Sequence, residues 1–82
     1  MNPHDISIFR NVERKLDKEG TDLAHIDVLV TRGEVTLTGL FLDRISHRDL
    51  TDLEIARIKQ TLMRVDGVTE VIIHLARASA FV

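Results

Sequence analysis

Apolar residues recur at every fourth position in the first part of the chain, which places them on one face of a helix. This stripe consists of Ile8, Val12 and Leu16. Asn2, which precedes a proline, and Asp5 are alternative N-caps, because both side chains accept hydrogen bonds from free N–H groups of a first turn. Gly20 can take the left-handed conformation that ends a helix. The pattern predicts a first helix from Asn2 or Asp5 to Gly20.

The apolar period then shortens to two residues, and β-branched residues dominate. Residues 26–31 and 35–39 alternate as two strands of a β-hairpin, with Gly33 free to take a positive φ in the turn at 32–34. One face of the hairpin then carries Ile26, Val28, Val30, Val35 and Leu37. Gly39, late in the second strand, indicates a bend, a bulge or a helix that crosses closely above it.

A polar connector at residues 42–50 leads to a second helix. Thr51 and Glu54 have the spacing of a capping box, so we expect the stable part of the helix to begin there. Ser46 and Asp49 form a weaker version of the same signal, which leaves an additional helical turn before Thr51 open. The apolar stripe of this helix consists of Ile55, Ile58, Leu62 and Val65.

Gly67 is the expected stop of the second helix, and a third strand follows at residues 68–75. Residues 76–82 either extend this strand or fray. The order α-β-β-α-β predicts an α+β domain of two layers, with two helices packed on one face of a three-stranded mixed sheet. A right-handed crossover would set the third strand parallel to the second. We interpret residues 1–82 as one domain, with a core at about 5–75 and a tail at 76–82.

Composition narrows the classes of function. The 82-residue chain has a net charge of −2, which argues against nucleic acid as a partner. It contains no cysteine, and hence no disulfide or cysteine nucleophile. Its apolar runs are far shorter than the roughly 20 residues of a membrane-spanning helix. The N-terminus lacks the sections of a signal peptide, so this chain by itself suggests a cytoplasmic location.

The order and spacing of these motifs resemble the BON domain family over residues 5–75. The matching motifs are Asp5-x-x-Ile8-x-x-x-Val12-x-x-x-Leu16, Ile26-Asp27-Val28, Gly33-Glu34-Val35-Thr36-Leu37-Thr38-Gly39 and Val65-x-Gly67-Val68-x-x-Val71. The stretch from Gly39 to Gly67 is longer than is usual in the family, by about seven residues, or roughly two helical turns.

The resemblance implies an α-β-β-α-β fold and a binding module that is not an enzyme. BON domains are common in bacterial envelope proteins, including osmotic-stress proteins and secretins, and are thought to associate with phospholipid surfaces or partner proteins. The family has no catalytic set, so we expect no catalytic residue and no cofactor. Gly33, Gly39 and Gly67 would have structural roles, as would Gly20 at its helix end. If the chain is an excised domain, the family points to the periplasm or envelope.

One candidate contact surface is a basic ridge on the first helix. Arg10, Arg14 and Lys18 recur every four residues and therefore lie in one line. Such a line could contact anionic lipid head groups or an acidic partner protein. The alternative is an ordinary solvated face, because Glu13 and Asp17 are interleaved with the ridge. Arg57 with Arg64 has the same ambiguity.

The candidates for chemistry are weak. The four histidines are His4, His25, His47 and His74. None stands three or four residues from another, so we expect no metal site, although His47 has Asp43 and Asp49 nearby. Ser46, His47 and Asp49 contain the residue types of a nucleophilic triad, but no strained elbow or oxyanion signature accompanies them. We interpret these three as helix-capping residues.

The face of the sheet that the helices leave open is expected to be partly apolar. It should carry Asp27, Leu29, Thr31, Glu34, Thr36, Thr38, Ile72 and His74. Leu29 and Ile72 are apolar, and small sheets must cover or blunt their edges. A homo-oligomer that forms through a sheet edge or this open face is therefore a second hypothesis. The alternative function is a protein–protein interaction or oligomerisation module, either cytoplasmic or part of a larger assembly.

Overall fold

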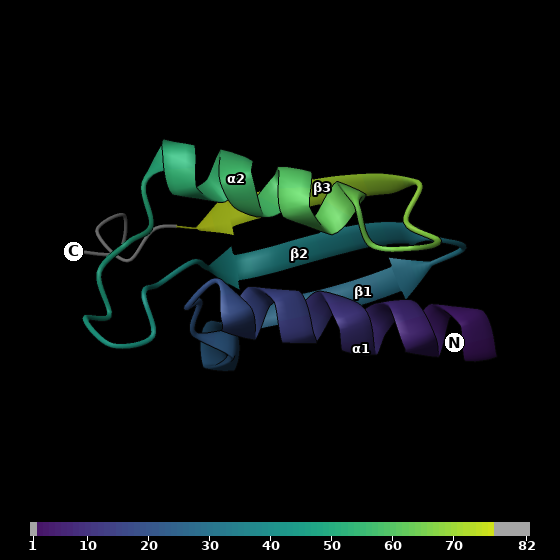
Figure 1. The fold of residues 1–82 in the computed structure, drawn as a ribbon. Coiled ribbons are helices and arrows are strands. Elements are labelled where there is room, and N and C mark those ends of the chain that lie inside the picture. Colours follow the sequence, from purple (N-terminus) through teal and green to yellow (C-terminus); the bar gives the residue numbers. More distant parts are fainter. Residues whose placement is uncertain (1, 77–82) are drawn as a thin grey trace.

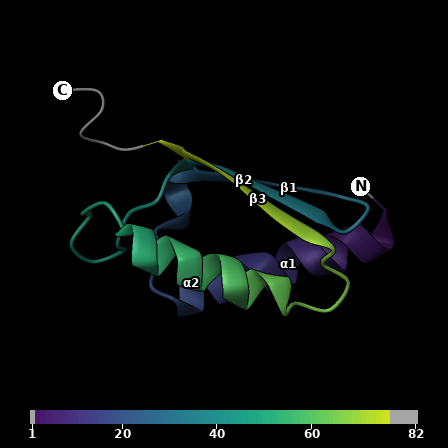
Figure 2. The same ribbon diagram turned by 90° about the horizontal axis from the view of Figure 1, so that it is seen from above.

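The computed structural model describes residues 2–76 and confirms the α+β class. Its elements are α1 (Pro3–Lys18), the short 3-10 helix η1 (Leu23–His25), β1 (Ile26–Thr31), β2 (Glu34–Leu40), α2 (Asp52–Met63) and β3 (Glu70–Ala76). The two long helices lie on one side of the sheet (Figure 1). Seen from above, helices and strands form two separate layers (Figure 2).

The sheet has the order β1-β2-β3, with β2 in the centre. β1 and β2 pair antiparallel, with Val28 opposite Leu37, and β2 and β3 pair parallel, with Leu37 opposite Ile73. The parallel pair confirms the predicted direction of β3 relative to β2. The sheet is therefore mixed, and the strands at both of its edges are β1 and β3.

α1 begins at the first of the two predicted caps. The Asn2 side chain accepts a hydrogen bond from the Asp5 N–H at 2.8 Å, and Pro3 occupies the first turn. Proline is favourable there because its missing N–H would have no partner within the helix. The helix ends at Lys18 with Glu19 as C-cap, and Gly20 follows with a φ of 82°.

Two residues of the hairpin turn have the left-handed backbone conformation. Arg32 has a φ of 52° and Gly33 a φ of 82°, as a two-residue turn between twisted strands requires. A Cβ at Gly33 would lie 2.5 Å from the carbonyl oxygen of Gly67. The glycine is thus required both by its φ and by the close approach of the loop before β3.

Gly39 is explained by a crossing backbone, although not by one of the long helices. Its φ is 135°, and a Cβ there would collide with the carbonyl oxygen of His25 at the end of η1. Of the three predicted explanations (a bend, a bulge or a closely crossing helix), the close crossing agrees best with the structure. The crossing segment is the short turn that enters β1.

The capping box of α2 is confirmed. The Thr51 side chain accepts from the Glu54 N–H at 3.1 Å, and the Glu54 carboxylate accepts from the Thr51 N–H at 3.0 Å. No helical turn precedes it. Instead, the Asp43 carboxylate accepts hydrogen bonds from the N–H groups of Ile45 and Ser46, each at 2.9 Å. Such side-chain bonds to the local backbone compete with helix formation.

The end of α2 corrects one prediction. The helix stops at Met63, with Arg64 as C-cap, and does not reach Gly67. Gly67 has a φ of 90° in the following loop, where a Cβ would meet the side chains of His4 and Ile8. β3 begins at Glu70, two residues later than predicted, and includes Ala76; residues 77–82 lie outside the described residues.

The core lies between the sheet and the two helices and is built from the predicted stripes. Its buried members are Ile8, Val12, Leu16, Ile26, Val30, Val35, Leu37, Phe41, Leu50, Ile58, Leu62, Val65 and Val71. The apolar ends of the 42–50 connector contribute more than its polar middle suggests. Leu42 and Leu50 are buried, and the preceding Phe41 is the largest fully buried side chain.

Candidate functional site

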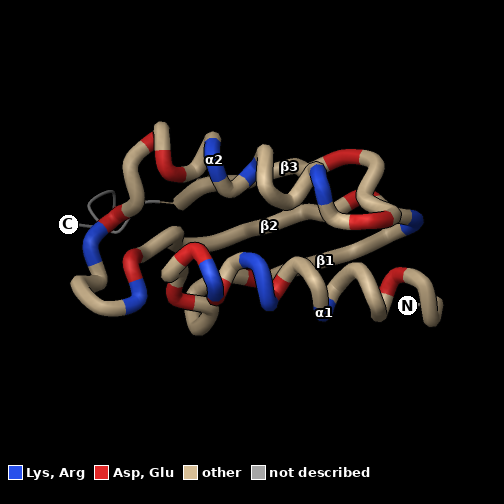
Figure 3. The backbone as a smooth tube through the Cα atoms, in the orientation of Figure 1, with Lys and Arg blue, Asp and Glu red and all other residues tan. Residues whose placement is uncertain are grey.

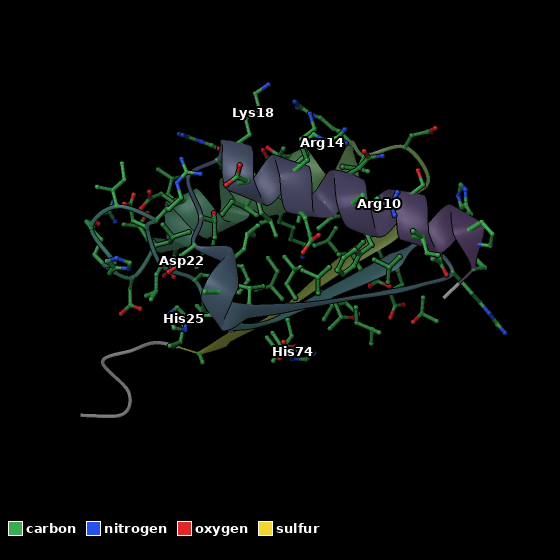
Figure 4. All side chains as sticks on the ribbon, turned by 90° about the horizontal axis from the view of Figure 1, so that it is seen from below. Arg10, Arg14, Lys18, Asp22, His25 and His74 are labelled. Atoms are coloured by element: carbon green, nitrogen blue, oxygen red, sulfur yellow. The ribbon has the colours of Figure 1, made fainter. Side chains whose placement is uncertain are left out.

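The basic ridge predicted from the sequence lies on the solvent face of α1. Arg10, Arg14 and Lys18 are exposed, while the opposite face of the helix is buried in the core. Figure 4 shows Arg14 and Lys18 pointing away from the sheet. With a rise of about 1.5 Å per residue, the ridge is about 12 Å long. We call these three residues the α1 basic stripe.

One of the two carboxylates interleaved with the stripe, that of Asp17, already forms an ion pair. Arg44, in the connector, donates a hydrogen bond from Nη1 to the Asp17 carboxylate at 2.6 Å and another to the Asp17 carbonyl at 3.1 Å. This ion pair matches the charge of Asp17 with a cation from outside α1. Of the interleaved carboxylates, Glu13 therefore remains as the one opposing charge beside the stripe.

The stripe residues themselves make few polar contacts. Arg14 donates to the Asn11 side chain at 3.2 Å. Within residues 2–76, none of the three cations forms an ion pair. Ile6, one turn before Arg10, is 39% exposed and continues the line with an apolar side chain. The sequence did not single out Ile6, because an isolated apolar residue beside a buried stripe has no distinctive pattern.

The second basic pair does not form a comparable surface. Arg64 is the C-cap of α2, and Arg57 lines a small pocket at the other end of that helix. The pocket has a volume of about 60 Å³ and is lined by Glu19, Leu50, Glu54, Arg57 and Ile58. Ligand sites usually measure about 300–1,000 Å³, so this space suits no more than a few waters. The acidic positions of α2 lie in its first turn and the basic positions follow them along the helix (Figure 3).

Two histidines meet at one carboxylate, a grouping that the sequence did not reveal. His25 Nε2 lies 3.9 Å and His47 Nδ1 lies 3.6 Å from the same oxygen of Asp22. Each imidazole pairs with that oxygen as an ion only when it is protonated. In the part of the chain that the structure describes, no three His, Cys, Asp or Glu side chains group as metal ligands.

Ser46, His47 and Asp49, which have the residue types of a nucleophilic triad, lie in the connector before α2. The Ser46 hydroxyl accepts from the Arg48 N–H at 3.4 Å, and His47, at a φ of 59°, faces Asp22 across the loop. They belong to the connector turn, which corrects the interpretation that they cap a helix. The N-cap of α2 is Thr51.

The strongest pKa shift in the described residues has a structural cause beside α2. A hydrogen bond from the Arg48 guanidinium at 3.1 Å, together with the Thr51 N–H, lowers the pKa of Glu54 from 4.5 to about 2. Glu54 reciprocally raises the pKa of Arg48. This exposed pair orders the end of the connector and the start of α2, so its role is structural.

The open face of the sheet carries the predicted residues. The strand pairing aligns Leu29, Thr36 and Ile72 in one row across the three strands. Leu29 is 58% exposed.

No helix within residues 2–76 combines the length and apolar character needed to cross a membrane. The chain matches no protein-family model, no curated protein and no solved structure.

Proposed function

We propose that this chain is a non-catalytic binding module of BON type that docks on an anionic phospholipid surface through the α1 basic stripe. The observation that carries the proposal is that the three cations of the α1 basic stripe are exposed and form no ion pair within residues 2–76, while Arg44 matches the charge of Asp17. Like charges at a spacing of four repel one another in a helix, and an anionic surface would relieve that repulsion.

The size of the effect is modest. A Lys or Arg close to an anionic leaflet contributes about 1 kcal/mol, so three contribute about 3 kcal/mol. Ile6, which is 39% exposed, adds a small apolar contact at the end of the stripe. Binding of this strength is reversible and sensitive to salt, because salt screens charges beyond a Debye length of about 10 Å at 0.1 M. The resemblance to BON domains supports a role for such docking in the bacterial envelope, including in proteins of osmotic stress.

Vesicle co-sedimentation tests the proposal. Vesicles of phosphatidylglycerol and phosphatidylcholine should pellet the chain at low salt and release it at high salt. Vesicles of phosphatidylcholine alone should leave it in solution. Equal binding to both compositions, or no binding to the anionic vesicles at low salt, would contradict the proposal.

A second candidate is a protein–protein interaction module, and the exposed Leu29 favours it. A leucine that is 58% exposed on an unpartnered sheet face is a better contact for a protein than for charged head groups. An envelope partner with an acidic surface could also use the α1 basic stripe. A partner that binds at Leu29 uses a different face of the domain from the α1 basic stripe, so variants of the two faces separate that partner from lipid docking.

A further inference from the structure

The open face of the sheet has a charge opposite to that of the α1 basic stripe. The strand positions include three carboxylates, Asp27, Glu34 and Glu70, and no Lys or Arg. All three carboxylates are exposed and alternate away from the buried strand positions. Figure 4 shows His74 projecting from the sheet on the side away from α1. The open sheet face and the α1 basic stripe therefore carry opposite charges.

Two of the carboxylates stand directly opposite each other. The parallel register pairs Glu34 of β2 with Glu70 of β3, on strands about 4.8 Å apart. Like charges in such positions destabilise a sheet. Within residues 2–76, neither carboxylate has a Lys or Arg partner. The arrangement is unfavourable in the isolated domain and would become favourable against a cation.

The charged positions bracket an apolar row. Two residues along β2 from Glu34, the row of Leu29, Thr36 and Ile72 crosses the sheet. Two residues further on, Asp27 lies opposite Thr38. The distance from the glutamate row to the Asp27 row is four residues of strand, or about 13 Å. An occupant of this face needs cations about 13 Å apart and aliphatic groups between them.

The α1 basic stripe has these dimensions. Arg10 and Lys18 are eight helical residues apart, or about 12 Å. Arg14 lies midway between them, and its aliphatic stem can cover Leu29 and Ile72 while its guanidinium stays at the polar rim. Arg10 would then face the two glutamates, and Lys18 would face Asp27. Both the charges and their spacing are complementary.

We infer that the open sheet face binds α1 of a second copy of this chain, in a head-to-tail arrangement. The inference goes beyond lipid docking and does not depend on it. Because the two contacting surfaces differ, each copy in a pair still has one of the two surfaces unused. The contact can therefore repeat, and it gives either a closed ring or an open chain. A 16-residue helix is about 24 Å long and about 10 Å wide, which makes this a small, weak interface.

Sedimentation velocity without lipid tests the inference with two charge-reversed variants. The first, Arg10→Glu/Arg14→Glu, reverses the stripe, and the second, Glu34→Lys/Glu70→Lys, reverses the sheet face. The wild type should associate as its concentration rises at low salt and dissociate at high salt. Each variant alone should stay monomeric under those conditions. An equimolar mixture of the two should associate again, because each supplies the face that the other lacks.

A wild type that stays monomeric, variants that associate as the wild type does, or a mixture that stays monomeric would each overturn the inference. Glu34→Gln/Glu70→Gln separates folding from binding. It should raise the thermal unfolding midpoint, because the like-charge pair is gone, and weaken association at the same time. Glu34→Lys/Glu70→Lys keeps the α1 basic stripe and should still bind anionic vesicles. Loss of self-association with retained vesicle binding therefore distinguishes the two proposals.

Discussion

The side chain of Asp5, in the first turn of α1, accepts a hydrogen bond from the backbone N–H of Gly33, 28 positions later in the hairpin turn. One carboxylate oxygen accepts from Gly33 at 3.2 Å, and the other accepts from the Arg32 N–H at 3.1 Å. Asp5 is only 4% exposed. This contact ties the start of α1 to the tip of the hairpin, on the same buried face of the helix as Ile8 and Val12.

Replacing Asp5 by alanine should destabilise the domain. The change leaves two N–H groups at the turn without their acceptor, and hydrogen bonds to a charged group are worth about 1.5–3 kcal/mol each. Because the bond to Arg32 is only partly buried, water can replace part of the lost acceptor, and we expect urea denaturation to show a loss of about 2–4 kcal/mol in unfolding free energy. Asp27→Ala, on the exposed sheet face, is the control and should change stability little. Similar losses for both variants would refute a special role for Asp5.

Two glycines with positive φ should respond differently to alanine. Gly20 has open space where a Cβ would be, so Gly20→Ala bears only the left-handed backbone penalty of about 1–2 kcal/mol. Gly39→Ala adds a collision with the His25 carbonyl, and only a backbone shift can relieve it. We expect this loss to be larger, about 2–4 kcal/mol. Chemical denaturation of the two variants side by side measures the difference, and equal losses would argue against the collision.

Thr21→Val should stabilise the domain. Thr21 is fully buried, and its hydroxyl oxygen has no hydrogen-bond partner within the described residues. Valine keeps the shape and removes the unsatisfied hydroxyl, which should raise the unfolding free energy by about 1 kcal/mol. Thr21→Ser keeps the hydroxyl and loses a methyl group, so it should lower stability. A Thr21→Val variant less stable than the wild type would indicate that the hydroxyl has a partner.

The Arg48–Glu54 pair should make stability depend on acid. The pKa of Glu54 falls from 4.5 to about 2 in the folded chain, so folding is favoured when this carboxylate is ionised. Its contribution is therefore complete above about pH 4.5 and declines as the pH falls toward 2. The thermal midpoint of the wild type should exceed that of Glu54→Gln near neutral pH. The gap should close over that acidic window, and a gap independent of pH would rule out the pair as its source.

The elements that follow from local rules were predictable from the sequence. Helix periodicity, strand alternation and the capping box each depend on residues a few positions apart, and the order α-β-β-α-β followed from them. The left-handed Arg32 had an available signal, because a two-residue turn between strands needs a positive φ at both positions. The Asp43 turn was the missed local signal that keeps the connector from forming a helical turn.

Contacts between distant residues were not predictable in this way. The spacing of the α1 basic stripe was evident in the sequence, but the Arg44–Asp17 pair joins residues 27 positions apart. The link from Asp5 to the hairpin has the same character, and so does the meeting of His25 and His47 at Asp22. Such pairs depend on how the layers pack, which periodicity and capping rules leave open.

The proposed docking of the α1 basic stripe on an anionic surface is tested most directly by one matched pair of variants. Arg14→Glu reverses the middle of the stripe, whereas Lys59→Glu makes the same charge change at an exposed position on α2. In low-salt co-sedimentation with phosphatidylglycerol vesicles, Arg14→Glu should weaken binding about tenfold or more, and Lys59→Glu should bind nearly as well as the wild type. Equal binding by the two variants would contradict the account.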